Sequence, residues 1–259
     1  MPQLSAVVIA HNAADRLGAC LDSLGFADEI LVYDGGSHDA SIGIAQAHGA
    51  RVVHAPDWRG FGIQRRRAQA EARYEWILMI DSDERISTAL AEEIRAAVNE
   101  NHPHLAYTLP RRTWAFGRYL NHGGWWPDPV VRLYHRERGR YDDALVHEKV
   151  VLDPQVRVRQ LKSPLYHHTY RDLNDYLVKS ARYASAWAEM RDRNGDKASL
   201  AAGLGHGLGC FLRIYLLKTG FLDGRAGLLL ALLSAHSTFV KYADLWLRRN
   251  DPGPPEKTP

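Results

Sequence analysis

Residues 76–84 read WILMIDSDE, an unbroken apolar run that ends in a polar segment with three acidic residues. A run that is apolar at every position predicts a strand buried on both faces, as in a parallel sheet. Similar strands are expected at residues 4–10 and 29–33. They also end in polar residues, the first in HN and the second in DGGSHD.

Segments with helical spacing alternate with these strands. Helices are expected over residues 12–24, 41–48, 61–73 and 87–99, with a further strand over 51–54. This alternation predicts an α/β fold with a mostly parallel sheet flanked by helices. Ligands of such sheets bind beyond the carboxyl ends of the strands. We therefore expect HN, DGGSHD and DSDE to meet at one edge of the sheet.

The pattern changes from about residue 107. Short strands are expected at 107–110 and 130–135, followed by helices at 173–192, 205–219 and 225–249. The last two helices are very apolar, and the tail DPGPPEKTP has a composition typical of disorder. The chain is thus divided into an α/β domain, an apolar helical appendage and a disordered tail, at residues 1–200, 201–250 and 251–259.

Composition limits the class of protein. The chain has 259 residues, of which 46% are hydrophobic, and a formal net charge of +3. The charge is unevenly distributed. Residues 1–130 contain 12 basic and 16 acidic residues, whereas residues 131–259 contain 21 basic and 14 acidic residues. Two cysteines exclude a disulfide framework, and the N-terminus lacks the marks of a secretory signal, so a cytoplasmic location is expected.

The DSDE segment is the sharpest chemical feature. Asp81 and Asp83 stand two residues apart at a strand end, with Ser82 between them, so both carboxylates could reach one divalent cation. Mg²⁺ and Mn²⁺ prefer oxygen ligands and tolerate substrate phosphates in their coordination shell. The alternative is a solvated acidic turn that caps the next helix. The position of DSDE directly after a wholly apolar strand favours the interpretation as a cation site.

The segment YDGGSHDAS also follows a strand and opens a helix. Its small residues would let a nucleotide approach the backbone, and the helix start offers unpaired N–H groups. Asp34 and Asp39 could accept hydrogen bonds from a base or a ribose. The segment matches neither the GxGxxG fingerprint nor a phosphate loop with GK[ST], so alone it is weak evidence.

Taken in order, VVIAHN, YDGGSHDAS, FGIQRRRA and WILMIDSDE resemble the inverting glycosyltransferases of family 2, which have the GT-A fold. HGGWWPD, VHE, YHHTY and FLDGRAGL extend this resemblance over most of the chain, toward the WaaE/LgtF-like subgroup that adds a sugar, often glucose, to the lipopolysaccharide core. One departure is that His38 and Ala40 replace the Thr and Gly of the usual STDGT-like segment.

The resemblance implies a site for a nucleotide-sugar donor, with a UDP-sugar expected. The implied donor contacts are Ala10, His11, Asn12, Asp34, Gly36, Gln64, Arg65, Asp81 and Ser82. A divalent cation, Mg²⁺ or Mn²⁺, would be held by Asp81 and Asp83, with His147 as a further contact.

The resemblance also implies a base that deprotonates the acceptor hydroxyl on the face of the sugar opposite the leaving group. Glu148 is the first candidate and Asp128 the second; without the resemblance, Glu148 would be interpreted as a surface glutamate. Trp125 and Trp126 could stack on the acceptor sugar or anchor a loop in the core.

Other polar residues carry a weaker signal. Arg111, Arg112, Arg118 and Arg132 could meet phosphates, although most such arginines are structural. The pair His167–His168 is interpreted as structural.

The C-terminal helices raise the question of a membrane. Residues 226–240 are free of charged side chains, but a transmembrane helix needs about 20 apolar residues. Apolar helices with flanking cations suit a peripheral position on an anionic membrane surface, at the inner face of the inner membrane. The alternative is that they pack against the α/β domain or a partner subunit.

The sequence thus predicts a metal-dependent transferase that moves a hexose, for example glucose, to a lipopolysaccharide-core or other lipid-linked acceptor. Two alternatives are a sugar nucleotidyltransferase and a non-catalytic, membrane-associated protein that binds nucleotide sugars. Binding of nucleic acid is not expected, because the basic residues are not interleaved with aromatic residues in the pattern of a known module.

Overall fold

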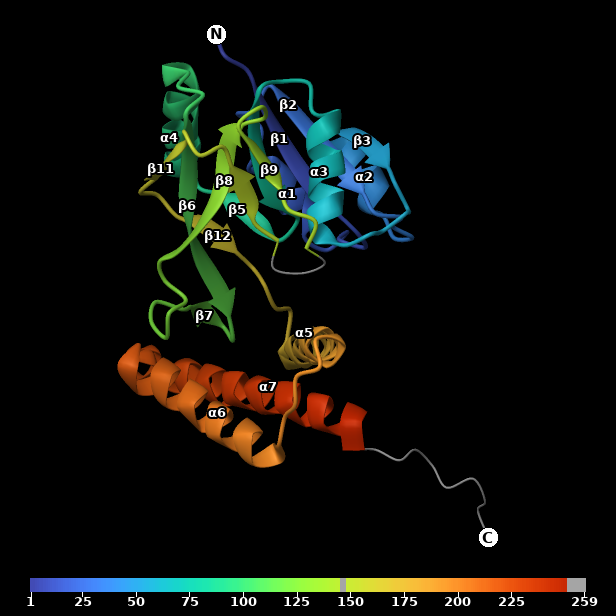
Figure 1. The fold of residues 1–259 in the computed structure, drawn as a ribbon. Helices are drawn as coiled ribbons and strands as arrows, with labels where there is room; N and C mark the ends of the chain where they lie inside the picture. The colour runs from blue at the N-terminus through green and yellow to red at the C-terminus, as the bar shows by residue number, and fades with distance from the viewer. Residues whose placement is uncertain (145–147, 251–259) are drawn as a thin grey trace. The chain divides into compact units, whose positions relative to one another are not determined.

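A computed structural model describes residues 1–144 and 148–250. The chain forms two compact units, of which the first comprises residues 1–113 and 127–169. The second comprises residues 114–126 and 170–250 (Figure 1). This division differs from the expected boundary at residue 200, because α5 (Leu173–Arg193) packs along α7 (Gly224–Asn250) in the second unit. The tail expected to be disordered lies outside the described residues.

The first unit is built on a mixed sheet. The strand order is β3 (Arg51–His54), β2 (Glu29–Asp34), β1 (Leu4–Ala10), β4 (Trp76–Asp81), β8 (Asp128–His135), β6 (Leu105–Ala115), β12 (Leu165–His167) and β5 (Glu84–Ile86). The first four strands are parallel, and β8 is antiparallel to both of its neighbours. Two further elements are β11 (Arg157–Gln160), parallel to β6, and the antiparallel pair β9 (Gly139–Tyr141) and β10 (Val150–Leu152).

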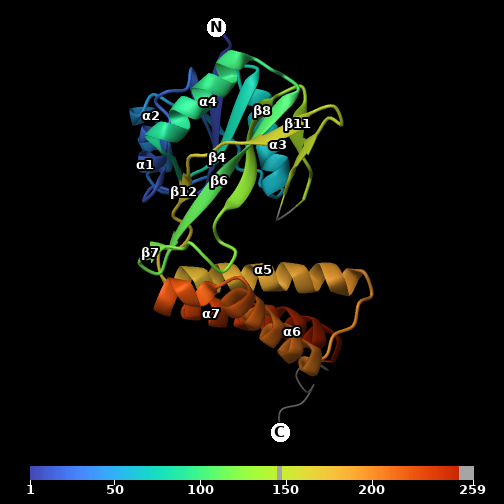
Figure 2. The ribbon, with the colours of Figure 1, turned by 90° about the vertical axis from the view of Figure 1, so that its left-hand side faces the viewer.

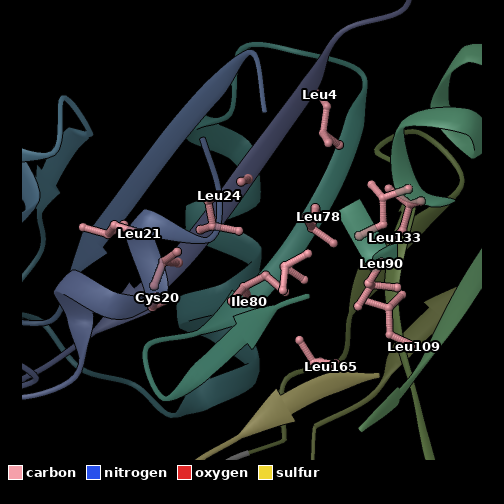
Figure 3. Close-up of a cluster of buried hydrophobic side chains, with 14 of the residues drawn as sticks. Leu4, Cys20, Leu21, Leu24, Leu78, Ile80, Leu90, Leu109, Leu133 and Leu165 are labelled. Atoms are coloured by element: carbon pink, nitrogen blue, oxygen red, sulfur yellow. The ribbon is translucent and has the colours of Figure 1, made fainter. Parts of the chain in front are cut away.

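Helices cover both faces of the parallel strands. On one face, α1 (Leu17–Asp22), α2 (Ser41–Ala47) and α4 (Thr88–Glu100) enclose the apolar cluster shown in Figure 3. On the other face, α3 (Phe61–Glu71) and β9 cover a second cluster. Side chains of β4 alternate between the two, since Leu78 belongs to the first cluster and Met79 to the second. This double burial explains why the strand is apolar at every position.

Strand register brings the three polar strand ends together. In β1, Ala10 pairs with Asp34 of β2, and Ile9 pairs with Asp81 of β4. The strands therefore end level with one another, at the same edge of the sheet. The predicted meeting of HN, DGGSHD and DSDE is confirmed by this register.

Helix α3 approaches the chain after β9 through a glycine. The Gly62 N–H donates to the Ala144 carbonyl oxygen at 3.1 Å. A Cβ atom at position 62 would lie 2.3 Å from the Asp142 carbonyl oxygen, far inside van der Waals contact. Any larger residue would push the helix and this segment apart.

We expect Gly62→Ala to destabilise the protein by about 2–3 kcal/mol, because the backbone carbonyl cannot move aside cheaply. Gly43→Ala is the matched control, since Gly43 also lies within a helix but an added Cβ would meet nothing within 4 Å. That variant should be neutral or more stable by up to about 1 kcal/mol, owing to the helix propensity of alanine. Urea unfolding measures both. Equal free energies of unfolding for the two variants would contradict the close approach.

The second unit is mainly helical. Beside α5 and α7 it contains α6 (Leu200–Leu212), a π-helical turn η1 (Arg213–Leu217), a 3-10 turn η2 (Gly220–Asp223) and the short strand β7 (Arg118–Tyr119), which pairs with the end of β6. Helix α6 lies along α7 (Figure 2). Glycines permit this contact, because a Cβ at Gly203 would stand 3.0 Å from the Tyr242 Cβ.

One buried carboxylate fixes loop 114–126 to these helices. Asp223 is 1% exposed and accepts hydrogen bonds from the backbone N–H groups of Asn121, at 3.0 Å, and His122, at 2.8 Å. Trp125 packs beside Leu120 and Leu230 in the small core of this unit.

Candidate active site

The loops that follow β1 and β2 hold each other in place. The Gly35 N–H donates to the Ala10 carbonyl oxygen at 2.8 Å. Asn12 donates its backbone N–H to Ser37 Oγ and accepts the His38 N–H on its side-chain oxygen, both at 2.9 Å. Asn12 has a φ of 48°, a conformation that asparagine tolerates better than most residues. The loops after the two strands thus form one connected surface, on which His11 and Asn12 are exposed.

Asp34 closes the second of these loops. Its carboxylate is 1% exposed and accepts the N–H groups of Gly36 and Ser37, each at 3.0 Å, and it contacts His54 Nδ1 at 2.9 Å. Burial alone would raise the pKa of Asp34, but these hydrogen bonds outweigh it and lower the pKa below its ordinary value. The structure gives Asp34 this loop-closing role; its contact with a nucleotide base stays a prediction.

Helix α3 carries two buried polar side chains toward the end of β4. Gln64 is fully buried and Arg65 is 3% exposed. The Arg65 guanidinium binds Asp81 through Nη2 and Glu148 through Nε, the latter at 2.8 Å. It also lies over the ring of Tyr141, 5.1 Å from its centre. One arginine therefore joins a predicted cation ligand to the predicted base.

Asp81 is held by a second arginine. Arg132 on β8 is 5% exposed and donates Nη2 to Asp81 Oδ2 at 2.5 Å and to Glu84 Oε1 at 2.7 Å. Burial opposes ionisation of Asp81, yet the charges of Arg132 and Arg65 lower its pKa far below the ordinary range. Asp81 is consequently a carboxylate at neutral pH.

The buried side chain of Glu84 stabilises the acidic turn DSDE. Glu84 has no exposed surface and accepts the Asp81 backbone N–H at 2.9 Å. Arg111 lies 3.7 Å from Glu84 and donates to Asp128 at 2.6 and 2.9 Å. The second candidate base, Asp128, is therefore already bound to a guanidinium.

Asp83 has looser partners than Asp81. Its carboxylate lies 3.4 Å from Arg16 Nη1 and 3.6 Å from His167 Nε2, and its side chain is 18% exposed. Burial opposes ionisation, but the neighbouring His167 and Arg16 lower the pKa of Asp83 below its ordinary value. Ser82 lies between the two aspartates and is partly exposed.

The donor atoms around Asp83 suit a divalent cation. Carboxylate oxygen and imidazole nitrogen are both ligands that Mn²⁺ accepts. Within residues 1–144 and 148–250, no group of three or more His, Cys, Asp or Glu side chains is arranged to hold a metal ion. The Asp81 oxygens are bound by Arg65 and Arg132, so Asp83 with His167 is the part of the site best suited to a cation.

Buried donors without partners surround the same region. In the described part of the chain, Gln64 Nε2, Arg65 Nη1 and Arg132 Nε are buried and have no hydrogen-bond partner. Unsatisfied buried donors of this kind are costly, and an anionic ligand would satisfy them.

The remaining predicted residues are placed differently. His147 lies outside the described residues. Trp125, Trp126 and Arg118 belong to the second unit, where Trp125 packs against its apolar core. The other described candidates belong to the first unit.

A comparison with protein families decides the identity of the fold. The family described as "Glycosyl transferase family 2" matches residues 5–151, more than half of the chain. The chain belongs to glycosyl transferase family 2. The polar strand ends and Glu148 all lie within the matched residues, and the fold is GT-A-like with a C-terminal helical region.

Relatives of this family 2 glycosyltransferase match it over nearly their full length. A lipopolysaccharide core biosynthesis glycosyltransferase, LpsC of Rhizobium meliloti, is 27% identical over 93% of each chain. An uncharacterized glycosyltransferase of Rickettsia bellii is 26% identical over 94% of this chain and 86% of its own. Among solved structures, the mannosyltransferase PcManGT of Pyrobaculum calidifontis, in complex with GDP-Man and Mn²⁺, has a TM-score of 0.51. It is 13% identical and covers 92% of this chain and 74% of its own, which supports the shared fold.

Sequence patterns did not indicate four residues of this cluster. Arg132 was one of four arginines grouped as mostly structural, and His167 was interpreted as structural; Arg16 and Glu84 received no role. Their positions in the sequence were the only indication of such a role. Arg132 lies within an expected strand, and Glu84 directly follows DSD. Pairing β8 with β4 brings Arg132 beside Asp81, and this pairing cannot be derived from local sequence.

Proposed function

We propose that this family 2 glycosyltransferase transfers a hexosyl group, with inversion, from a nucleotide sugar to a lipopolysaccharide-core or other lipid-linked acceptor. The observation that carries the proposal is the attachment of Asp81 and Glu148 to the same Arg65 guanidinium. A residue at the donor end and a residue suited to act as a base are thereby held in one cluster. The name of the R. meliloti relative supports the acceptor class, and UDP-sugar is the expected donor.

The leaving group of such a reaction is a nucleoside diphosphate, whose developing negative charge must be stabilised. A divalent cation bound by Asp83 and His167, with Asp81 in reach, would supply positive charge against that diphosphate. PcManGT, solved with GDP-Man and Mn²⁺, is a precedent for this pairing within the fold. The free N–H groups of Arg65 and Arg132 are suited to donate to phosphate oxygens.

The acceptor hydroxyl must lose its proton as its oxygen attacks the anomeric carbon. Glu148 would accept that proton, while the bond from the anomeric carbon to the diphosphate breaks on the opposite face and the configuration inverts. The hydrogen bond from Arg65 Nε to Oε1 orients the Glu148 carboxylate. The proposed place of reaction is the cytoplasmic side of the membrane, where the nucleotide sugars would be available.

A thermal-shift panel of nucleotide sugars, with and without Mn²⁺, tests the donor and the cation together. We expect one donor to raise the melting temperature only when Mn²⁺ is present, since ligand binding to the native state stabilises it. The same donor should then support transfer to a lipopolysaccharide extract, and excess chelator should remove both effects. Release of pyrophosphate from a nucleoside triphosphate would instead indicate a nucleotidyltransferase, and donor binding without transfer would indicate a non-catalytic protein.

A further inference from the structure

Exposed leucines recur every fourth residue along α6 and η1. Their exposed fractions lie between 40% and 63%, and the residues are Leu200, Leu204, Leu208, Leu212 and Leu216. A spacing of four places side chains along one side of a helix. This side of the helix therefore carries a continuous apolar stripe open to solvent.

The apolar surface continues around the turn into α7. Exposed residues here are Leu217, Phe221, Leu222, Leu228, Leu229 and Leu232, of which Leu217 is 80% exposed. In the 18-residue apolar window of each of the two helical stretches, 200–217 and 220–250, only 17% is buried. We refer to the exposed leucines of α6 and η1 together with these residues as the hairpin face. Contiguous apolar surface of this extent is typical of an interaction site.

Charge around the hairpin face has one sign. Residues 197–243 contain five Lys or Arg residues and one acidic residue, Asp223. Asp223 is 1% exposed and engaged with the backbone of loop 114–126. Arg213, Lys218 and Arg225 are exposed among the leucines. The segment thus combines apolar side chains and cations and offers no exposed carboxylate.

We propose that the hairpin face docks on an anionic phospholipid bilayer. A second copy of the chain is a poorer occupant, because a symmetric pairing of this face would bring cations against cations with no carboxylates to compensate them. An anionic leaflet supplies both partners that the face lacks, acyl chains for the leucines and phosphates for the cations. The proposal adds a membrane surface to the proposed function and does not depend on the reaction.

The hairpin lies in the interface and does not cross the bilayer. By length and composition, the two stretches 200–217 and 220–250 could each cross a membrane. Crossing as a pair would place Arg213, Lys218 and Arg225, which flank the turn, on the far side of the bilayer, whereas Lys and Arg in short loops favour the cytoplasmic side. In the interface, leucines enter the acyl boundary while the long cationic side chains reach the headgroups.

Sedimentation of the full chain with vesicles tests the proposal without any measurement of activity. The probes are vesicles of phosphatidylcholine alone and vesicles that also contain phosphatidylglycerol. We expect stronger binding to the anionic vesicles, and a loss of about tenfold or more in Leu204→Glu/Leu208→Glu, given the apolar area removed. The control is Val151→Glu/Val158→Glu, which adds the same charges at residues that are 54% and 51% exposed in the first unit and should bind as the parent does. Circular dichroism establishes that the variants fold.

A second variant separates the charges from the leucines. Arg213→Gln/Lys218→Gln/Arg225→Gln should bind anionic vesicles no better than neutral ones, since these cations supply the attraction to an anionic surface. A parent protein that stays in the supernatant with both kinds of vesicle overturns the proposal. Self-association that Leu204→Glu/Leu208→Glu abolishes, without vesicle binding, assigns the face to a second copy instead. Resistance to extraction from cell membranes by alkaline carbonate overturns the interfacial position in favour of a spanning one.

Discussion

Asp81→Ala should abolish sugar transfer, with a loss in kcat/KM of about a thousandfold or more, because the charge that organises the donor end of the site disappears. The substitution also leaves Arg65 and Arg132 buried without their shared counter-charge. Removing one partner of a buried ion pair costs about 3–5 kcal/mol, so the melting temperature should fall as well. Transfer assays and thermal unfolding measure the two effects.

Asp83→Ala separates chemistry from folding. The ion pairs of the Asp83 side chain, at 3.4 and 3.6 Å, are longer than those of Asp81, so its loss should cost less stability while it still removes transfer and the Mn²⁺-dependent thermal shift. Asp153→Ala is the control for loss of an acidic side chain, because Asp153 pairs with Arg138 and is 40% exposed. It should leave transfer unchanged. Full activity of both Asp81→Ala and Asp83→Ala would refute a role for the DSDE turn.

Glu148→Gln should bind the donor normally and lose transfer by about a hundredfold to ten-thousandfold, the range typical of a removed general base. Glutamine can still accept the hydrogen bond from Arg65 Nε, so the site should keep its shape. The expected signature is therefore a fall in kcat with an unchanged donor affinity, measured by initial rates and by thermal shift.

Two comparisons make this result specific. Glu100→Gln is the control, since Glu100 is exposed and pairs with Arg159 at 3.5 Å, and it should transfer as the parent does. Asp128→Asn tests the second candidate base. If Glu148→Gln kept its turnover and Asp128→Asn lost it, the base would be Asp128.

Local sequence was sufficient for the first half of the fold. The apolar run at residues 76–80 became β4, and Ser87, at the start of the helix expected over 87–99, accepts the Leu90 N–H at 3.2 Å. These features follow from burial and from hydrogen bonding between near neighbours in the chain. The helix expected over 12–24 is shorter, at Leu17–Asp22, because the residues before it are hydrogen-bonded to the loop after β2.

The balance of charges in the site could not be predicted in the same way. Asp81 and Asp83 were interpreted as ligands of one divalent cation, and the sequence did not indicate that Asp81 also binds Arg65 and Arg132 from two other elements. Both contacts join residues that are far apart in the sequence. They depend on the packing of α3 against the sheet and on the pairing of β8 with β4. The compact units are divided at other residues than the expected boundary for a similar reason, since composition showed that α6 and α7 are apolar but not that α5 packs along α7.

The course of β6 has a practical consequence for work with fragments. This strand begins in the first unit and ends in the second, and the loop that follows it is tied to Asp223 near the far end of the chain. No single cut separates the two units. A protein shortened after residue 169 would keep loop 114–126 but lose the carboxylate that binds its backbone and Leu230, a member of the core against which Trp125 packs. Poor solubility of such a truncated protein would then be explained by the apolar residues of loop 114–126 that have lost their packing partners. It would not be evidence that the first unit needs a membrane.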